Sequence, residues 1–168
     1  MDDVFEPKPT TFTISDYLVK RMILSPPNWQ SYVAHTRLDW RPVLFSADTV
    51  DEVPNDERGV YSFVVQPGIA GHPACSYLLY VGKVETQVFR ARYRQYLAEK
   101  AKGEGARRVH VTRMLQKWDG YLWFYYASIK AAELITSVED ALVAAYLPPG
   151  NREVPAEVRY ALKSALDL

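Results

Sequence analysis

A chain of 168 residues is long enough for one domain with a single hydrophobic core. Its apolar fraction of 48% and charged fraction of 24% are typical of a soluble globular protein and exclude an intrinsically disordered chain. The 20 basic and 20 acidic side chains cancel, so any nucleic-acid partner must be held by a local basic patch.

The chain carries one cysteine, Cys75, which cannot form an internal disulfide, and no residues with the spacing of a zinc site. We expect Cys75 to be a small core residue in a protein of a reducing, cytoplasmic compartment. The acidic start lacks the apolar run of a signal peptide. No stretch approaches 18 apolar residues, so we expect no membrane partner.

Residues 1–57 are predicted to form a helical N-terminal extension that packs on the same domain as the rest. No linker inside the chain is long enough to divide it into separate domains. The composition of the extension predicts no function. Its expected elements are an extended lead-in over 1–12, a helix over 16–24 that Pro26-Pro27 ends, a short helix over 28–35, and a strand or extended edge over 41–45.

A β-hairpin is predicted in the middle of the chain. Gly59 begins a strand over 59–65, and a second strand of leucine, valine and aromatic residues over 76–81 ends at Gly82. The connecting loop of about ten residues is longer than most hairpin loops, which favours a binding role. Good helix formers then fill residues 87–102.

The second half alternates helices and a strand. Thr136 or Ser137 is expected to cap a helix whose first turn holds Glu139. The other expected elements are a helix over 107–118, an aromatic strand over 121–129, a helix stop over 148–151 and a terminal helix over 155–166.

Tyr61 and Tyr80 lie on the two neighbouring strands of this hairpin, so their phenols can converge near Lys83 and Arg92. A phenol with an unperturbed pKa of about 10 needs nearby cations to act as a general base at neutral pH. We expect Lys83 to lower the pKa of Tyr61, our preferred base for the attacking water. Which of the two tyrosines is the base stays open.

Glu139 supplies a carboxylate near the predicted start of a helix, where the helix dipole favours a negative charge. One carboxylate can hold a magnesium ion when substrate phosphate and water complete its shell. An arginine that forks onto phosphate oxygens, a carboxylate-held metal and a tyrosine base together predict phosphodiester hydrolysis.

The triplets Gly59-Val60-Tyr61 and Tyr80-Val81-Gly82 resemble the paired signature of the GIY-YIG nucleases. This family includes homing endonucleases, the excision-repair incision subunit and some restriction enzymes. The segment 89–96 resembles the family helix, in which an aromatic residue or histidine follows the catalytic arginine by four residues. In that register Arg92 is the arginine and Tyr96 its companion, with Arg90 as the rival assignment.

Three further residues fit this resemblance. Lys83 resembles the lysine that commonly follows the second triplet. Glu139, and Asn151 twelve residues later with Pro148 three before it, are similar to the metal-binding glutamate and the downstream asparagine of the family.

The resemblance covers residues 58–152 and implies an α/β (α+β) fold, with a small three-stranded antiparallel sheet flanked by helices and a C-terminal segment, 153–168, that follows it. The implied activity is that of a DNA endonuclease that uses one Mg²⁺ or Mn²⁺ ion. The implied catalytic residues are Tyr61, Tyr80, Lys83, Arg92, Glu139 and Asn151, with Glu139 as the metal ligand.

The expected partner is DNA, with a homodimer if both strands of a duplex are cut. Taken singly, the remaining arginines of the two central helices are typical of solvated helix faces, but as a cluster they can follow a phosphate backbone. The alternative function is a catalytically inactive nuclease-like domain that binds nucleic acid or a partner protein. The candidate DNA-binding residues are Arg90, Arg94, Arg107, Arg108 and Arg113.

Overall fold

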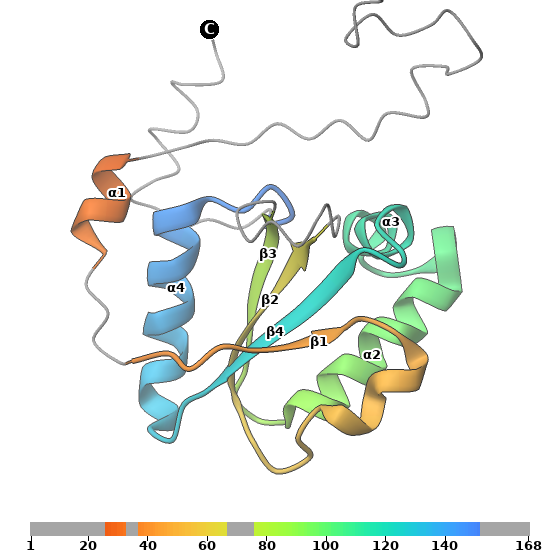
Figure 1. Ribbon diagram of the computed structural model, residues 1–168, viewed down its shortest axis with the longest axis horizontal. Coiled ribbons are helices and arrows are strands. Elements are labelled where there is room, and N and C mark those ends of the chain that lie inside the picture. The colour runs from red at the N-terminus through yellow and green to blue at the C-terminus, as the bar shows by residue number, and fades with distance from the viewer. Residues whose placement is uncertain (1–25, 33–36, 67–75, 152–168) are drawn as a thin grey trace, which may run out of the picture.

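The computed structural model describes residues 26–32, 37–66 and 76–151. Within them the chain has a mixed α+β fold built on one antiparallel sheet, with helices on both faces (Figure 1). The strand order is β1-β4-β2-β3, so β2 is central and β3 lies at one edge. The strands are β1 (Arg41–Leu44), β2 (Gly59–Val65), β3 (Tyr77–Val84) and β4 (Leu122–Ser128).

Two hydrophobic cores lie on the two faces of this sheet, because successive residues of a strand point to opposite sides. The larger core holds Tyr61 and Phe63 of β2 together with the buried side chains of α2 and α3. The smaller core holds Val60 and Val81 together with α4. The described helices are α1 (Pro26–Ser31), α2 (Phe89–Lys102), α3 (Val109–Lys117) and α4 (Ile135–Tyr146).

The sheet has four strands where the sequence predicts three. The additional strand is β1, which pairs with β4 from Arg41↔Tyr126 to Leu44↔Trp123. It comes from the segment predicted to be an extension, so residues 41–44 belong to the same sheet as the rest of the described chain. Its bounds fall within the range read as a strand or an extended edge.

Two predicted helix boundaries are wrong. Pro26 begins α1, whereas the sequence predicts a short helix that starts at residue 28; proline suits a first turn because the N–H it lacks has no partner there. The last described helix begins at Ile135, and Leu134 precedes it without a side-chain cap. Neither Thr136 nor Ser137 is therefore the cap, and Glu139 lies one turn further into the helix than predicted.

Some predicted elements lie outside the described residues. They are the lead-in over 1–12, the helix over 16–24, the end of the helix predicted over 28–35, most of the long hairpin loop with Cys75, and the helix over 155–166. Among the helices that the structure describes, none has the length and apolar character needed to cross a membrane.

A β-bulge in β3 sets the direction of Tyr80. The pairing of β2 with β3 runs from Tyr61↔Gly82 to Phe63↔Tyr80 and then skips to Val64↔Leu78, so Leu79 is the extra residue. Such a bulge lets two successive side chains point to one face. Leu79 and Tyr80 both pack against the larger core, on the α2 side of the sheet.

Candidate functional site

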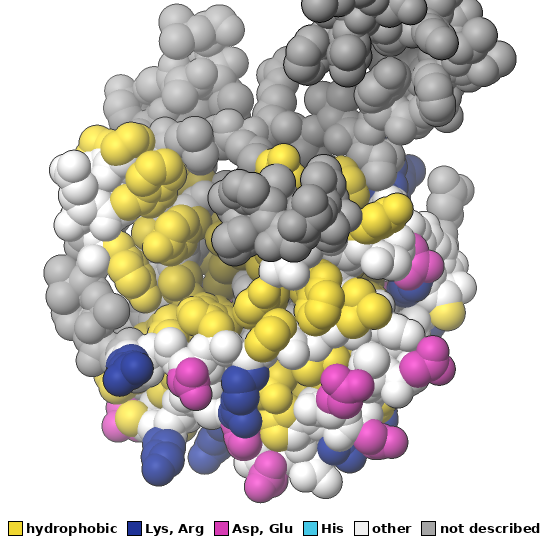
Figure 2. Space-filling view, in the orientation of Figure 1, with side chains coloured by type: hydrophobic (Ala, Val, Ile, Leu, Met, Phe, Trp, Pro, Cys, Tyr) yellow, Lys and Arg dark blue, Asp and Glu magenta, His cyan; other side chains and the backbone are white. Residues whose placement is uncertain are grey.

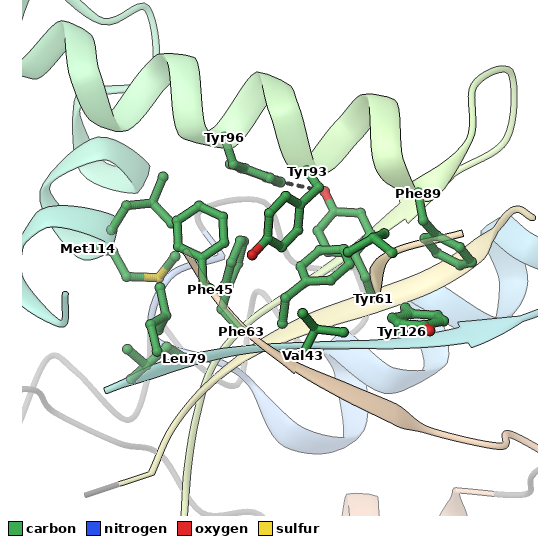
Figure 3. Packing of buried hydrophobic residues seen from close by; sticks show 14 of the residues in the cluster. Val43, Phe45, Tyr61, Phe63, Leu79, Phe89, Tyr93, Tyr96, Met114 and Tyr126 are labelled. Atoms are coloured by element: carbon green, nitrogen blue, oxygen red, sulfur yellow. Dashed lines mark hydrogen bonds between the residues drawn. The ribbon is translucent and has the colours of Figure 1, made fainter. Parts of the chain in front are cut away.

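Three tyrosines from three elements meet beneath α2. Tyr61 comes from β2, Tyr80 from β3 and Tyr96 from α2, with ring centroids 5.8 to 6.4 Å apart, and we call this group the tyrosine cluster. The Tyr61 and Tyr96 hydroxyls share a hydrogen bond of 2.6 Å (Figure 3). The Tyr61 ring also stacks on Phe124 at 5.2 Å.

The two signature tyrosines differ in exposure. Tyr61 is buried, with 2% of its surface exposed, whereas Tyr80 is only partly buried. Burial raises the pKa of both phenols because it disfavours the phenolate. Two cations act against this shift: Arg92 favours the phenolate of Tyr61, and Arg108 that of Tyr80.

Lys83 lies on the other face of β3 from Tyr61. Tyr61 pairs with Gly82, and the next side chain along the strand points away from it. The Lys83 ammonium instead donates to Thr136 Oγ1 at 2.8 Å and forms an ion pair with Glu139 at 3.1 Å. The prediction that Lys83 lowers the pKa of Tyr61 is therefore wrong.

Glu139 lies on α4 with 18% of its side chain exposed. Burial raises its pKa, and Lys83 opposes that shift by favouring the carboxylate. The charge of Glu139 in turn raises the pKa of Tyr80, so the carboxylate and this phenol share one local field. Lys83 and Glu139 therefore pair on the α4 side of β3, whereas Tyr80 of the same strand packs on its α2 side.

The side chains near Glu139 can bind only a metal ion that takes most of its ligands from water and substrate. No group of three or more His, Cys, Asp or Glu side chains that could hold a metal occurs among residues 26–32, 37–66 and 76–151. Glu139 offers carboxylate oxygens, which hard divalent cations prefer. The residues therefore fit Mg²⁺ or Mn²⁺ when water and phosphate supply most of the shell, and they do not fit a closed protein cage.

The structure separates the two rival arginines of α2. Arg90 is held by residues around η2 (Ala47–Glu52), since it donates to Val53 O at 2.7 Å and pairs with Asp51 at 3.2 Å. Arg92 contacts amide groups: it donates to Gln95 Oε1 at 3.0 Å, and the Gln87 carbonyl, with its amide turned toward the guanidinium, accepts from it at 3.0 and 3.1 Å. No carboxylate of the described chain forms an ion pair with Arg92, which leaves its charge available to an anion.

The other arginines divide into two groups. Arg94, Arg107 and Arg113 are exposed, which fits both a solvated helix face and contact with a phosphate backbone. Arg108 differs from this expectation, because its guanidinium turns inward. It bonds Glu99 Oε1 at 2.8 and 3.1 Å and lies 5.0 Å from the centre of the Tyr96 ring.

Asn151 lies against the outer edge of β3. Its side-chain amide donates to Val81 O at 2.8 Å and accepts from Val81 N at 2.9 Å, as a neighbouring strand would. The adjacent Gly150 N donates to the carbonyl of the bulged Leu79 at 2.7 Å. Asn151 therefore fixes the strand that carries Tyr80 and Lys83, and both polar ends of its amide are used for this contact.

The glycines of the two triplets are required by close packing. A Cβ on Gly82 would lie 2.5 Å from the Tyr61 hydroxyl, so the second triplet must end in glycine for the tyrosine of the first to cross it. Gly59 has a φ of +151° and a Cβ there would lie 2.2 Å from Ala127 O. Both positions connect the spacing in the sequence to the packing of β2, β3 and β4.

Two polar residues of the site were not predicted. Thr136 binds the Lys83 ammonium and donates to Glu85, although the sequence indicates a helix cap at this position. Glu99 binds Arg108; its place three residues after Tyr96, on the same helix face, is the signal that could have found it.

A separate pocket of about 530 Å³ lies on the opposite face of β2 and β3. Its walls contain none of the predicted site residues. Apolar side chains also gather over the upper part of the face in Figure 2, with Lys, Arg, Asp and Glu along its lower part. The pocket is lined by Tyr32, Arg37, Leu38, Trp40, Ser62, Val64, Leu78, Val81, Tyr125, Leu142 and Tyr146.

Comparison with known proteins adds no relative: no family model, curated protein or solved structure matches this chain. The chemistry must therefore follow from the side chains themselves. The partly exposed phenol of Tyr80 can accept a proton. Arg92, which contacts only amides within the described chain, can bind a phosphate group, and the carboxylate of Glu139 can hold a hard cation.

Proposed function

We propose that this chain is a metal-dependent endodeoxyribonuclease with a GIY-YIG-like catalytic core. The contact of Tyr80 with Tyr61 on one face of β3 and the Lys83–Glu139 ion pair on its other face support this proposal. These residues come from three separate elements and include the residue types that phosphodiester hydrolysis requires. The three neighbouring strands β4, β2 and β3 make up the core sheet, with β1 added to it.

In this proposal the protein binds and orients the scissile phosphate. Arg92 forks onto phosphate oxygens, since amides alone hold its guanidinium in place. Glu139 holds the divalent ion, which supplies positive charge to the phosphate oxygens as negative charge develops there. Lys83 keeps the Glu139 side chain ionised and oriented. Asn151 acts indirectly by fixing β3.

Of the two phenols, Tyr80 is better placed to contact the attacking water. The Tyr61 hydroxyl is buried and already hydrogen-bonded to Tyr96, so it is a poor candidate for contact with substrate. We therefore assign Tyr80 to the water and Tyr61 to the support of the cluster, which reverses the preference drawn from the sequence. The raised pKa of Tyr80 requires the bound ion and Arg108 to favour its phenolate.

Incubation of the full chain with plasmid and single-stranded DNA, in Mg²⁺, Mn²⁺ or chelator, tests the proposal. We expect cutting with either ion and none with chelator. Glu139→Ala should abolish cutting while the fold and much of the DNA binding remain, because the carboxylate is not part of a core. Absence of cutting by folded protein under every condition would refute the proposal, and cutting by Glu139→Ala at the parental rate would refute the metal assignment.

A catalytically inactive domain that binds nucleic acid or a partner protein is the second candidate. The ion pair between Lys83 and Glu139 favours it, because the ammonium already neutralises the carboxylate that would hold a metal. DNA binding that persists in chelator, without cutting in any divalent ion, would select this function.

A further inference from the structure

Arg108 occupies an unusual place for a helix-flanking arginine. It precedes α3, and 29% of its side chain is exposed. Two of its nitrogens donate to Glu99 Oε1, at 3.1 Å from Nε and 2.8 Å from Nη2. Glu99 is itself 19% exposed, and its second carboxylate oxygen is buried without a hydrogen-bond partner within the described part of the chain.

The free edge of this guanidinium points at the tyrosine cluster. Arg108 Nη1 donates to the Tyr96 hydroxyl at 3.5 Å, and its central carbon lies 5.0 Å from the centre of the Tyr96 ring. The Tyr96 hydroxyl continues to Tyr61 at 2.6 Å. A continuous polar chain therefore runs from Glu99 through Arg108 and Tyr96 to Tyr61, beneath α2.

We propose that Arg108, oriented by Glu99, is a positioning residue of the tyrosine cluster, which holds the Tyr96 phenol, and through it the Tyr61 hydroxyl, in place. The inference rests on the proposed function for its catalytic meaning. Arg108 does not touch substrate; it acts through the phenols that it orients.

The charge and burial of the Arg108–Glu99 ion pair indicate that it does more than connect α2 to α3. A partly buried ion pair loses much of its Coulomb energy to desolvation, so it gives little stability over an apolar contact, and one oxygen of this pair lacks a partner. What the pair does provide is a fixed cation beside the Tyr96 phenol. The charge of Arg108 favours the phenolate of Tyr80.

The groups that face Tyr80 come from every element packed around it. The Tyr61 ring faces it from β2 and the Tyr96 ring from α2, and Tyr96 raises the pKa of Tyr80. Arg108 faces it from the start of α3, and Glu139 acts on it from α4. Loss of Arg108 therefore leaves Tyr80 with neighbours that disfavour its phenolate.

Three variants separate this role from a structural one. Arg108→Gln removes the charge, Arg108→Lys keeps it without the forked contact, and Glu99→Gln weakens the orientation of the guanidinium. Lys117→Gln, an exposed change on α3, is the matched control. Thermal unfolding shows which proteins are folded, and Arg108→Lys keeps the test valid if Arg108→Gln does not fold.

The first readout is DNA cleavage with Mg²⁺ under single-turnover conditions. We expect Arg108→Gln to lower the cleavage rate by roughly 10- to 100-fold, with little change in the DNA concentration at half-maximal rate, because misplaced groups slow chemistry more than binding. Arg108→Lys should recover part of the loss, and Lys117→Gln should match the parent.

The second readout does not need cleavage. With 3-fluorotyrosine incorporated and each resonance assigned by a Tyr→Phe change, ¹⁹F NMR reports each phenol of the cluster. Arg108→Gln should move the Tyr96 and Tyr61 resonances relative to the parent. Unchanged spectra in folded Arg108→Gln would overturn the inference, whether or not the parent cuts DNA. A parent that does not cut would refute only the proposed function.

Discussion

At the scale of single residues, the two signature tyrosines differ in exposure and have different proposed roles, even though they belong to one cluster. Tyr61 is enclosed by aromatic rings and bonded to Tyr96, whereas Tyr80 is partly open at the strand edge. A phenol that must meet water and phosphate needs access, and a phenol that supports the packing needs burial. The same side chain therefore serves two purposes in adjacent strands.

Removal of the Tyr61 hydroxyl should affect stability, and removal of the Tyr80 hydroxyl should affect the cleavage rate. Tyr61→Phe removes the shorter of the two hydrogen bonds of the buried Tyr96 hydroxyl, so we expect a loss of about 0.5–1.5 kcal/mol of unfolding free energy. Tyr80→Phe should change stability little and slow DNA cleavage by roughly 100-fold or more. Denaturant unfolding and single-turnover cleavage of both variants measure this. Cleavage by Tyr80→Phe at the parental rate would exclude Tyr80 as the base.

A matched pair of substitutions distinguishes the two arginines of α2. Arg90→Ala removes the contacts to Val53 and Asp51 and should lower the unfolding temperature. Arg92→Ala should leave that temperature nearly unchanged and slow cleavage by on the order of 100-fold, because it removes the guanidinium from the phosphate. Full cleavage activity in Arg92→Ala would favour Arg90 instead as the arginine that binds the phosphate.

The residue types of the site were predictable from the sequence, but some of their contacts were not. Motif spacing predicts Tyr61, Tyr80 and Glu139 as site residues; in the fold the two tyrosines meet beneath α2, and Glu139 pairs with Lys83 on the α4 side of β3. The partner of Lys83 was wrong because proximity in sequence to Gly82 says nothing of the face to which the ammonium points. That face follows from the register of β2 and β3, which pairs Tyr61 with Gly82.

At the scale of elements, the bulge in β3 links the last described turn to the site. The bulged residue Leu79 has no partner in β2, and its carbonyl accepts a hydrogen bond from Gly150 N, 71 positions further along the chain. Sequence patterns predict β2, β3 and β4 because β-branched and aromatic residues fill them. They cannot predict a bulge that depends on so distant a contact, nor the helix that begins at Ile135 without a side-chain cap.

Gly82→Ala tests the packing that joins the two triplets. The added Cβ would lie 2.5 Å from the Tyr61 hydroxyl, and the ring cannot yield easily because it stacks on Phe124. We expect a loss of about 1–3 kcal/mol in unfolding free energy. Gly105→Ala is the control, since no atom lies within 4 Å of its added Cβ. Equal unfolding temperatures for the two variants would contradict this packing.

Glu57 connects three elements and gives the fold a pH dependence. Just before β2, its carboxylate accepts hydrogen bonds from Ser128 of β4 and from Arg41 of β1. The Ser128 hydrogen bond, followed by the Arg41 contact, lowers the pKa of Glu57 below its ordinary value. Its contribution is therefore complete above pH 4.5, the ordinary value, and is lost as the pH falls through the lower folded-state pKa.

Denaturant unfolding of the parent and Glu57→Gln from neutral to strongly acidic pH measures this contribution. The difference in unfolding free energy should be constant near neutral pH and shrink in acid. Asp56→Asn, an exposed neighbouring change, should show no such difference. A gap between parent and Glu57→Gln that widens as the pH falls would contradict the sign.

At the scale of the whole molecule, a neutral chain has to bind a polyanion through local charge. The 20 basic and 20 acidic side chains give no net field, and several basic groups are used internally, as Arg90 and Arg108 are. The α+β class and the position of the sheet between helices were predicted from the sequence. The sequence predicts β1 only as a strand or an extended edge, because its four residues include a proline and give a weak pattern.

The central claim is that Glu139 holds the ion that makes this strand edge a nuclease site. Cleavage and DNA binding, followed in the same samples with Mg²⁺ for the parent, Glu139→Gln and the exposed control Glu133→Gln, test it most directly. We predict that Glu139→Gln binds DNA within a few-fold of the parent but cuts at least about 100-fold more slowly, while Glu133→Gln matches the parent in both. Parental cleavage by Glu139→Gln would contradict the account.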